Sequence, residues 1–76
     1  MVEIDIHGFT KAQAKVEIEK FIAGLPSDVK MVRIIHGYHG GTNLREFVQR
    51  PNNIRSKRIK RKRLTMNQGE TIFELF

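Results

Sequence analysis

The sequence contains no cysteine and no tryptophan, and only two of its 76 residues are proline. Without cysteine, the chain can form neither a disulfide nor a thiolate metal site, which fits a reducing compartment. No run of about 18 apolar residues occurs, so we expect no membrane-spanning helix. A chain this short must rely on one small hydrophobic core, and we therefore predict a single domain over residues 1–76.

The first residues also lack the features of an export signal. Residues 1–7 alternate between apolar and polar side chains from the start. They contain neither the basic segment nor the long apolar segment that a secretory signal peptide requires. We interpret them as the start of the mature protein and expect a cytoplasmic location.

Acidic residues are absent from one segment, residues 50–63, in which basic residues are concentrated. The whole chain has 14 Lys and Arg against 8 Asp and Glu, a net charge of +6. The segment, called the basic run below, carries these basic residues: Arg50, Arg55, Lys57, Arg58, Lys60, Arg61, Lys62 and Arg63. Such a concentration is typical of a surface that contacts a polyanion. The alternatives are a solvated basic segment or an anionic membrane surface, and the latter is disfavoured because the run lacks an apolar helix face.

The first third of the chain predicts a strand followed by a helix. Residues 2–6 alternate between apolar and polar side chains, as a strand with one apolar face does. Thr10 and Gln13 form the pattern of a capping box, so a helix should begin after Thr10 and end near Gly24 and Pro26. Its buried stripe should consist of Ala14, Ile18, Phe21, Ile22 and Leu25.

The middle third predicts a second strand, a glycine-rich loop and a short helix. Residues 29–35 predict a strand in which Met31, Val32, Ile34 and Ile35 form a nearly continuous apolar run, as in a strand that is covered on both faces. The loop follows at residues 36–42. A helix should begin after Thr42, since Leu44, Phe47 and Val48 have helical spacing, and it should end at residues 51–53.

The last third is dominated by the basic run. From Ile54 onward we predict a basic strand at a sheet edge, with a flexible basic loop as the alternative. Residues 67–69 have the composition of a turn, and residues 71–76 should form a last strand that pairs antiparallel with the basic one. The fold class is thus α/β, a small two-layer sandwich of order β-α-β-α-β-β. Its first two strands should be parallel and joined by a right-handed crossover.

Polar side chains follow both predicted parallel strands. Strand periodicity puts Asp5 and His7 on one face at the carboxyl end of the first strand, and His36 follows the second. Ligands of open α/β sheets bind just beyond these strand ends, so we expect the three side chains to converge. Each also has an ordinary structural interpretation, because Asp5 could cap a turn and His7 could be a satisfied histidine at the core boundary.

The same edge is suited to a phosphate group. Both helices are expected to begin there, and helix N-termini present unpaired N–H groups and partial positive charge. Gly40 and Gly41 have no Cβ and would let the backbone approach a phosphate closely. The alternative is that this glycine pair forms only a turn.

Three segments together carry a family resemblance. Ile4-Asp5-Ile6-His7-Gly8, followed by Ala14, resembles the first motif of the Smr (small MutS-related) domain family. Residues 35–45 resemble its second motif, a His-Gly loop with further glycines that ends in leucine. Here the loop is one residue longer, and His39 stands in place of a glycine. Residues 69–72 are similar to the Gly-x-Thr-aliphatic start of the last strand of the family.

This resemblance covers almost the whole chain and implies both a fold and an activity. The implied fold is a sheet with packed helices, similar to the C-terminal domain of bacterial translation initiation factor three. The family includes nucleases that nick DNA or cut RNA, and members that only bind. The resemblance marks Asp5 and His7 as the candidate catalytic pair, and His36, Gly37, Gly40 and Gly41 as the candidate substrate-binding loop.

We expect an endonuclease, with RNA favoured over DNA as its substrate because RNA supplies its own 2′-hydroxyl nucleophile. His7 would act as general base or acid, since an imidazole titrates at about 6.5. Asp5 would orient His7, and His36 or His39 would be the second proton carrier. Asp5 is the one carboxylate predicted at this edge, so we expect no metal site and no cofactor. A single weakly bound divalent ion held by Asp5 and a histidine is the alternative.

The expected partner is nucleic acid. Tyr38 would stack on a base, and the other contacts would come from the loop, the second helix and the basic run. The predicted contact residues are Gly37, Tyr38, His39, Gly40, Gly41, Thr42, Arg45, Arg55, Lys57, Arg58, Lys60, Arg61, Lys62 and Arg63. The alternative function is a non-catalytic nucleic-acid-binding module, including a ribosome-associated one, that uses the basic run. The altered loop favours this alternative, and the intact Asp5-x-His7 pair favours the enzyme.

Overall fold

The computed structural model describes residues 1–37 and 43–76, in which strands and helices follow the predicted order β-α-β-α-β-β. The elements in chain order are β1 (Val2–Asp5), α1 (Lys11–Ala23), β2 (Met31–Ile35), α2 (Asn43–Gln49), β3 (Ile59–Leu64) and β4 (Glu70–Leu75). The strands form one sheet in the order β1-β2-β4-β3, with β1 parallel to β2 and both other pairs antiparallel. The predicted α/β fold class, the parallel pair and the antiparallel hairpin are confirmed.

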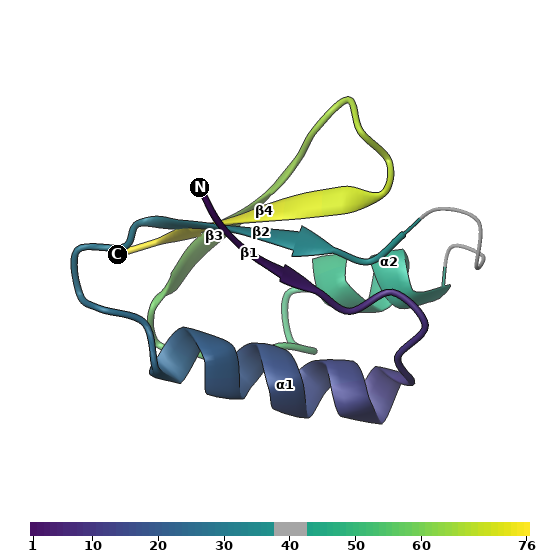
Figure 1. Ribbon diagram of the computed structural model, residues 1–76, viewed down its shortest axis with the longest axis horizontal. Helices are drawn as coiled ribbons and strands as arrows, with labels where there is room; N and C mark the ends of the chain where they lie inside the picture. Colours follow the sequence, from purple (N-terminus) through teal and green to yellow (C-terminus); the bar gives the residue numbers. More distant parts are fainter. Residues whose placement is uncertain (38–42) are drawn as a thin grey trace.

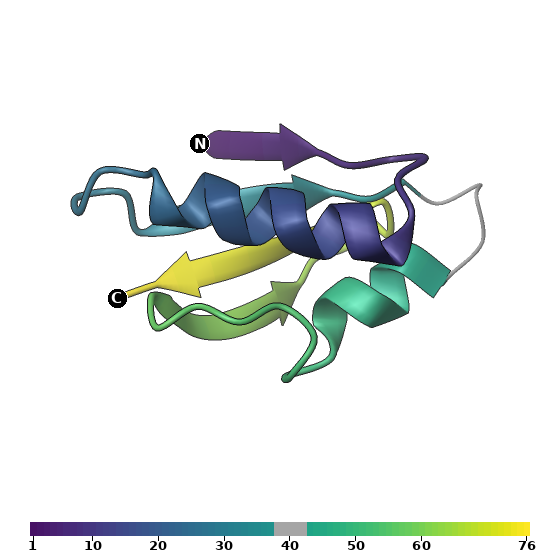
Figure 2. The same ribbon diagram turned by 90° about the horizontal axis from the view of Figure 1, so that it is seen from below.

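Both helices lie against the same face of the sheet, which we call the helix face (Figures 1 and 2). The opposite face, called the open face, carries no helix among the described residues. The two-layer architecture therefore positions every strand residue either toward the helices or toward solvent, and alternate residues of each strand take alternate sides.

Helix α1 follows its sequence signals closely. The Thr10 hydroxyl accepts the Gln13 backbone N–H at 3.1 Å, and the Gln13 side chain accepts the Thr10 backbone N–H at 3.0 Å. These bonds close the predicted capping box, and Gly24 is the C-cap. Of the predicted stripe, Ala14, Ile18 and Ile22 are fully buried, and the remaining residues, Phe21 and Leu25, are partly buried against the same core.

Strand β2 corrects one prediction. Its residues alternate between partly exposed and buried, with Val32 and Ile34 on the helix face, so the expectation of a strand covered on both faces was wrong. Its nearly continuous apolar sequence has a different cause. On the open face, Ile72 of β4 lies opposite Arg33 and diagonal to Met31 and Ile35, and it is only 2% exposed. Met31 and Ile35, the apolar β2 residues of the open face, therefore flank this isoleucine, over which no helix of the described residues lies.

Strand β3 is the basic strand at the sheet edge that the sequence predicts, and the flexible-loop alternative is wrong. It begins at Ile59 rather than Ile54, because Ile54 is a buried loop residue that packs into the core. A register shift between Ile59 and Arg61 makes Lys60 an inserted residue. Register places Ile59 opposite Leu75 and Lys62 opposite Phe73, on the helix face, while Arg61 and Arg63 lie opposite β4 residues of the open face.

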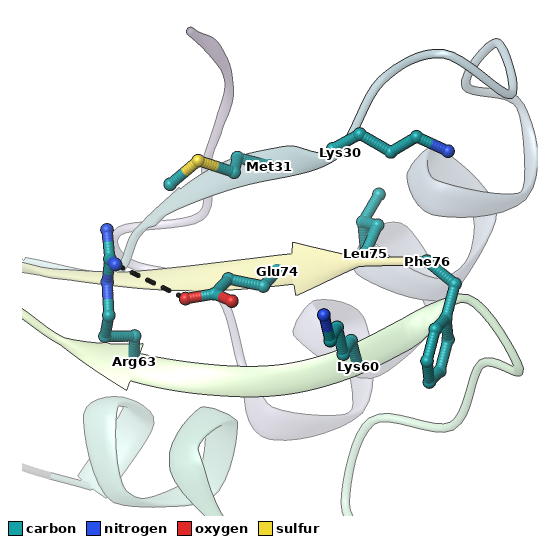
Figure 3. Close-up of a pocket in the computed structure, with 7 residues that line it drawn as sticks. All are labelled: Lys30, Met31, Lys60, Arg63, Glu74, Leu75 and Phe76. Atoms are coloured by element: carbon teal, nitrogen blue, oxygen red, sulfur yellow. Dashed lines mark ion pairs between the residues drawn. The ribbon is translucent and has the colours of Figure 1, made fainter.

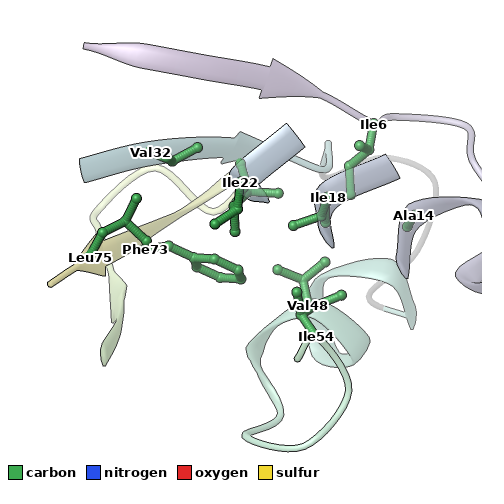
Figure 4. Packing of buried hydrophobic residues seen from close by; sticks show 10 residues of the cluster. Ile6, Ala14, Ile18, Ile22, Val32, Val48, Ile54, Phe73 and Leu75 are labelled. Carbon is green, nitrogen blue, oxygen red and sulfur yellow. The ribbon is translucent and has the colours of Figure 1, made fainter. Parts of the chain in front are cut away.

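The core fills the space between the helix face and the two helices (Figure 4). Phe73 is its largest fully buried side chain, and it lies among residues from both helices and from β2 and β4. Ile6, just beyond β1, closes the core at the carboxyl end of the parallel strands. The residues that follow Ile6 and Ile35 are therefore held at one edge by buried neighbours.

Candidate functional site

The three motif segments meet at the carboxyl end of β1 and β2. The Ile6 N–H donates to the Ile35 carbonyl at 2.8 Å, which joins the ends of the two parallel strands. The N–H groups of His36 and Gly37 both donate to the Gly69 carbonyl at 3.0 Å, which joins the start of the loop to the β3–β4 turn. Segments far apart in the sequence thus form one edge, as the strand order predicted.

Asp5 and His7 are in direct contact at this edge. One carboxylate oxygen of Asp5 lies 2.7 Å from His7 Nδ1 and accepts the His7 backbone N–H at 3.0 Å. The side chains are 51% and 73% exposed, respectively, so both can reach a solvent-borne ligand. Contact between residues two apart arises because β1 ends at Asp5 and the chain then turns. The predicted pairing of these two side chains is therefore present.

The pairing sets the chemistry of the imidazole. A carboxylate can only accept hydrogen bonds, so Nδ1 of His7 carries the hydrogen and Nε2 of the neutral ring presents a lone pair to solvent. The hydrogen bonds from His7 hold the pKa of the Asp5 carboxyl below its ordinary value. Asp5 is thus ionised at neutral pH and oriented toward Nδ1, the arrangement in which a carboxylate orients a histidine base.

Two glycines shape the surroundings of His7. Gly8 has φ of +79° and lets the chain turn from β1 toward α1. Gly37 has φ of +82°, and a Cβ at this position would lie 3.4 Å from the Cβ of His7. Glycine at both positions therefore permits a backbone conformation that side chains disfavour, and at Gly37 it also permits close approach to His7.

The electrostatic surroundings of His7 differ on its two sides. Helix α1 begins at Lys11, a few residues after His7, and has no acidic residue in its first turn, so its positive end is not neutralised. On the open face, Arg33 lies between two acids, with 3.1 Å to Glu3 and 3.4 Å to Glu70. The start of α1 is therefore suited to an anion, whereas the neighbouring open face carries two acids against one arginine.

His36 does not join Asp5 and His7. Because it continues the alternation of β2, its ring lies on the helix face, is 4% exposed, and has partners for both ring nitrogens. Nδ1 lies 3.1 Å from the Gly37 carbonyl, and Nε2 lies 2.9 Å from the Thr71 hydroxyl. The expected convergence of three side chains is thus met by only two of them, since the strand alternation puts the third on the other side of the sheet.

The hydrogen-bond partners determine which nitrogen of His36 carries the proton. The Gly37 carbonyl can only accept, so Nδ1 is the donor. Burial lowers the pKa of His36, which keeps the ring neutral and leaves Nε2 to accept the hydroxyl hydrogen of Thr71. Thr71 in turn accepts an N–H of the Gln49 side chain at 3.0 Å. This chain of hydrogen bonds ties α2, β4 and the start of the loop together. Thr71 belongs to the third motif segment, whereas Gln49 carried no functional signal in the sequence.

The basic run is not one continuous contact surface, which corrects the interpretation of two of its members. The guanidinium of Arg58 donates to four carbonyls at 2.7 to 3.2 Å, those of Ile22, Leu25, Pro26 and Val29. It therefore closes the end of α1, whose last carbonyls lack partners within the helix. The amine of Lys62 lies 5.2 Å from the centre of the Phe73 ring and donates to the Arg50 carbonyl, and burial lowers its pKa. Both residues hold the fold.

The other predicted contact residues, with Arg50 of the basic run, fall into four groups. Arg61 and Arg63 pair with the two carboxylate oxygens of Glu74 at 3.4 and 3.3 Å. Arg45 donates to the Gln68 side chain at 3.3 Å, next to the β3–β4 turn. Exposed side chains without an ion pair to any described residue are those of Arg50, Arg55, Lys57 and Lys60. Tyr38, His39, Gly40, Gly41 and Thr42 lie outside the described residues.

Within residues 1–37 and 43–76, no three or more His, Asp or Glu side chains are grouped so that they could hold a metal ion. Over the same residues, no helix has the length and apolar character needed to cross a membrane.

Comparisons with known proteins support the family suggested by the motifs. A family model described as Smr domain matches residues 4–69. Among solved structures, the crystal structure of the Smr domain of Thermus thermophilus MutS2 is similar, with a TM-score of 0.83. The match covers 100% of this chain and 99% of that chain at 23% sequence identity, so it shows the fold. No curated protein matches this chain.

Proposed function

The chain belongs to the Smr domain family, and from this we propose that it is an endonuclease that cleaves RNA in preference to DNA. Smr domains are associated with nucleic-acid binding and nuclease activity, which gives the broad class of function. The observation that carries the finer proposal is the exposed Asp5–His7 pair, in which the 2.7 Å contact leaves one imidazole nitrogen available to a substrate.

The pair is suited to activate a ribose hydroxyl. In the proposed reaction Nε2 of His7 takes the proton of the 2′-hydroxyl, and the 2′-oxygen attacks the adjacent phosphorus. The bond from phosphorus to the 5′-oxygen breaks, which gives a 2′,3′-cyclic phosphate and a 5′-hydroxyl end. Asp5 stabilises the imidazolium that forms on His7. DNA has no 2′-hydroxyl, and this is the reason for the proposed preference.

The leaving 5′-oxygen needs a proton from a second group. His36 and His39 are the candidates from the sequence, and the ring of His36 is buried with both nitrogens engaged. We therefore assign this role to His39 and give His36 the role of holding the start of the loop. The positive end of α1 follows His7 by a few residues in the chain, and in the proposal it would stabilise the charge that develops on the phosphate.

No metal is needed in this scheme, because an imidazole rather than a metal-bound water supplies the base. Asp5 and His7 are two potential ligands on one edge, which is fewer than a tight magnesium site requires. We propose that cleavage persists in EDTA. Loss of cleavage in EDTA, with recovery on addition of Mg²⁺ or Mn²⁺, would instead assign a weakly held ion to the pair.

The test is cleavage of end-labelled single- and double-stranded RNA and DNA by the wild type and by Asp5→Asn and His7→Ala. Asp28→Asn, an exposed acid in the turn between α1 and β2, is the matched control for loss of one negative charge. We expect RNA to be cut by the wild type and the control alone. Replacement of the attacking ribose by 2′-deoxyribose at the cleaved position should also prevent cutting.

The alternative is a binding module that does not cleave. It is supported by Glu3 and Glu70, which reduce the positive potential of the open face next to Asp5 and His7 and so disfavour a phosphate at the pair. A binding module would retain RNA in a salt-dependent way and cut nothing, and both site substitutions would leave its affinity unchanged. Co-sedimentation with ribosomes in the absence of turnover on free RNA would identify the ribosome as its partner.

A further inference from the structure

A groove on the open face lies away from the Asp5–His7 pair. It has a volume of about 640 Å³ and runs along β4 between the start of β2 and β3. Lys60 and Phe76 lie at one end of it and Arg63 at the other, and Met31 lines its β2 side (Figure 3). Its volume is within the range of ligand-binding clefts, roughly 300 to 1,000 Å³.

The register of β3 determines which cations reach this groove. Strict alternation through Ile59–Leu64 would place consecutive basic residues on opposite faces. The inserted Lys60 changes this pattern, so that Arg61 and Arg63 lie on the open face and Lys60 lines the same groove. A bulge at a sheet edge thus adds a cation to the open face while Ile59 stays against the core.

Charge is unevenly distributed across the open face. On the β3 side, Lys60, Arg61 and Arg63 face the single acid Glu74. On the β1 side, Arg33 is paired with Glu3 and Glu70, and the carboxylate of Asp5 follows. The β3 side therefore carries the excess positive charge that attracts a polyanion. Lys30 lies at the rim, where its exposed amine donates to the Ser27 carbonyl at 2.9 Å.

An exposed aromatic ring lies beside these cations. Phe76 is 65% exposed, and its backbone N–H donates to the Arg58 carbonyl at 2.9 Å, which fixes its position next to Lys60. Cations along a groove together with an exposed aromatic side chain are the combination that binds single-stranded nucleic acid, because an unpaired base can stack on the ring. A duplex keeps its bases stacked on each other and could not use Phe76.

The groove also leads toward the proposed site. Because β3 is antiparallel to β4, which is antiparallel to β2, β3 runs in the same direction as β1 and β2. Its carboxyl end thus lies at the edge that carries His7. Four residues along β3 and three strand spacings across the sheet separate Lys60 from Asp5, a path of about 20 Å. One extended strand of RNA can cover this distance.

We propose that a single strand of RNA binds along β3 on the open face, with its phosphates at Lys60 and Arg63 and a base on Phe76. The proposal rests on the proposed function, because it supplies the path by which the RNA reaches His7. It differs from a contact through the whole basic run, since it uses one face of one strand and includes Lys30 and Phe76, which lie outside the run.

The test measures binding of single-stranded RNA as a function of salt, with Asp5→Asn in the background so that no substrate is cut. Lys60→Ala and Arg63→Ala should each lower the slope of log affinity against log salt by about 0.7. Lys20→Ala removes an exposed cation on α1 and should leave the slope unchanged. Phe76→Ala should weaken single-strand binding roughly tenfold and leave duplex binding unchanged.

A gain of binding keeps the test independent of folding defects. Glu74→Gln removes the carboxylate that both arginines pair with, so it should tighten single-strand binding. Glu17→Gln, an exposed acid on α1, is its control. If the groove variants bind as their controls do while the parent protein binds RNA, the groove is wrong and the proposed function stands. If the parent protein binds no RNA, both the groove proposal and the proposed function fail. If the groove variants lose as much affinity for duplex RNA as for single-stranded RNA, the single-strand path is wrong.

Discussion

Two histidines follow neighbouring parallel strands, and the fold gives them opposite environments. His7 comes after β1 and is largely exposed beside Asp5, whereas His36 comes after β2 and is buried between the sheet and α2. The difference arises from the side of the sheet on which each ring lies. The alternation of side chains along a strand therefore decides whether the histidine that follows it is exposed to a substrate or buried in the fold. Substitutions at the two histidines should have different effects on cleavage and on stability.

The largest expected effect is on cleavage by variants of the exposed pair. His7→Ala should lower the cleavage rate by about 10² to 10⁴, the usual contribution of a general base, and Asp5→Asn should lower it as well. Because both side chains are exposed, stability should change by less than about 0.5 kcal/mol. Single-turnover cleavage and urea unfolding of the same preparations give the two quantities. A His7→Ala enzyme that cuts at the wild-type rate would remove His7 from the mechanism.

The buried histidine should show the opposite profile. His36→Phe leaves the buried Thr71 hydroxyl without its acceptor, the Nε2 of His36, and an unsatisfied buried group costs about 1–3 kcal/mol. Urea unfolding should show this loss. The double variant His36→Phe, Thr71→Val removes both partners and should recover part of the stability. Equal stability of His36→Phe and the wild type would mean that the network does not hold α2 to the sheet.

Gly37 contacts both histidines, and its substitution should have intermediate effects on cleavage and on stability. Gly37→Ala forces a side chain into a left-handed conformation, which costs roughly 1–2 kcal/mol, and places a methyl group against His7. We expect reduced cleavage together with reduced stability. Gly24→Ala is the control, because its backbone is right-handed and a Cβ there meets atoms only at 3.7 Å or beyond. A Gly37→Ala protein with full activity would show that His7 tolerates the displacement.

The smallest expected effect is on the pH dependence of stability. Burial lowers the folded-state pKa of His36, so the unfolded chain binds the proton more readily. The stability that neutral His36 contributes should be fully present above the unfolded-state pKa of about 6.5. It should decline as the pH falls toward the folded-state pKa, by no more than about 1.4 kcal/mol per pH unit. His36→Gln should flatten this decline in urea unfolding series. The pKa values of Asp5 and Glu19 are lowered in the folded state, so the stability that these carboxylates contribute is lost only at more acidic pH.

Local signals in the sequence were sufficient for most of the secondary structure. Thr10 with Gln13 and the terminal Gly24 defined α1, because capping and helix periodicity depend on neighbours within a few turns. The start of β3 was placed too early, since Ile54 has the apolar character of a strand residue but is buried from a loop. Arg58 supports that loop through carbonyls distant in the sequence, and no local pattern indicates such bonds.

Some features of the candidate site could likewise be predicted from the sequence, and others could not. The contact of Asp5 with His7 follows from two residues at a strand end and could be anticipated from the sequence. The burial of His36 and the removal of Arg58 and Lys62 from the contact surface could not, because each depends on a partner on another element. Lys30 and Phe76 carried no functional signal in the sequence, since they lie outside every motif and join the basic strand only through the order of the sheet.

The sequence by itself determined the order of strands and helices, the three motif segments and the placement of Asp5 and His7 at one strand end. These features depend on periodicity, capping and neighbours close along the chain. Only the tertiary structure decided which side of the sheet each polar residue occupies and which basic residues remain available to a ligand. The physical reason is that the direction of each side chain depends on strand register. The inserted Lys60 changes the register of β3 against β4, and a pattern in the sequence of β3 alone does not reveal this pairing.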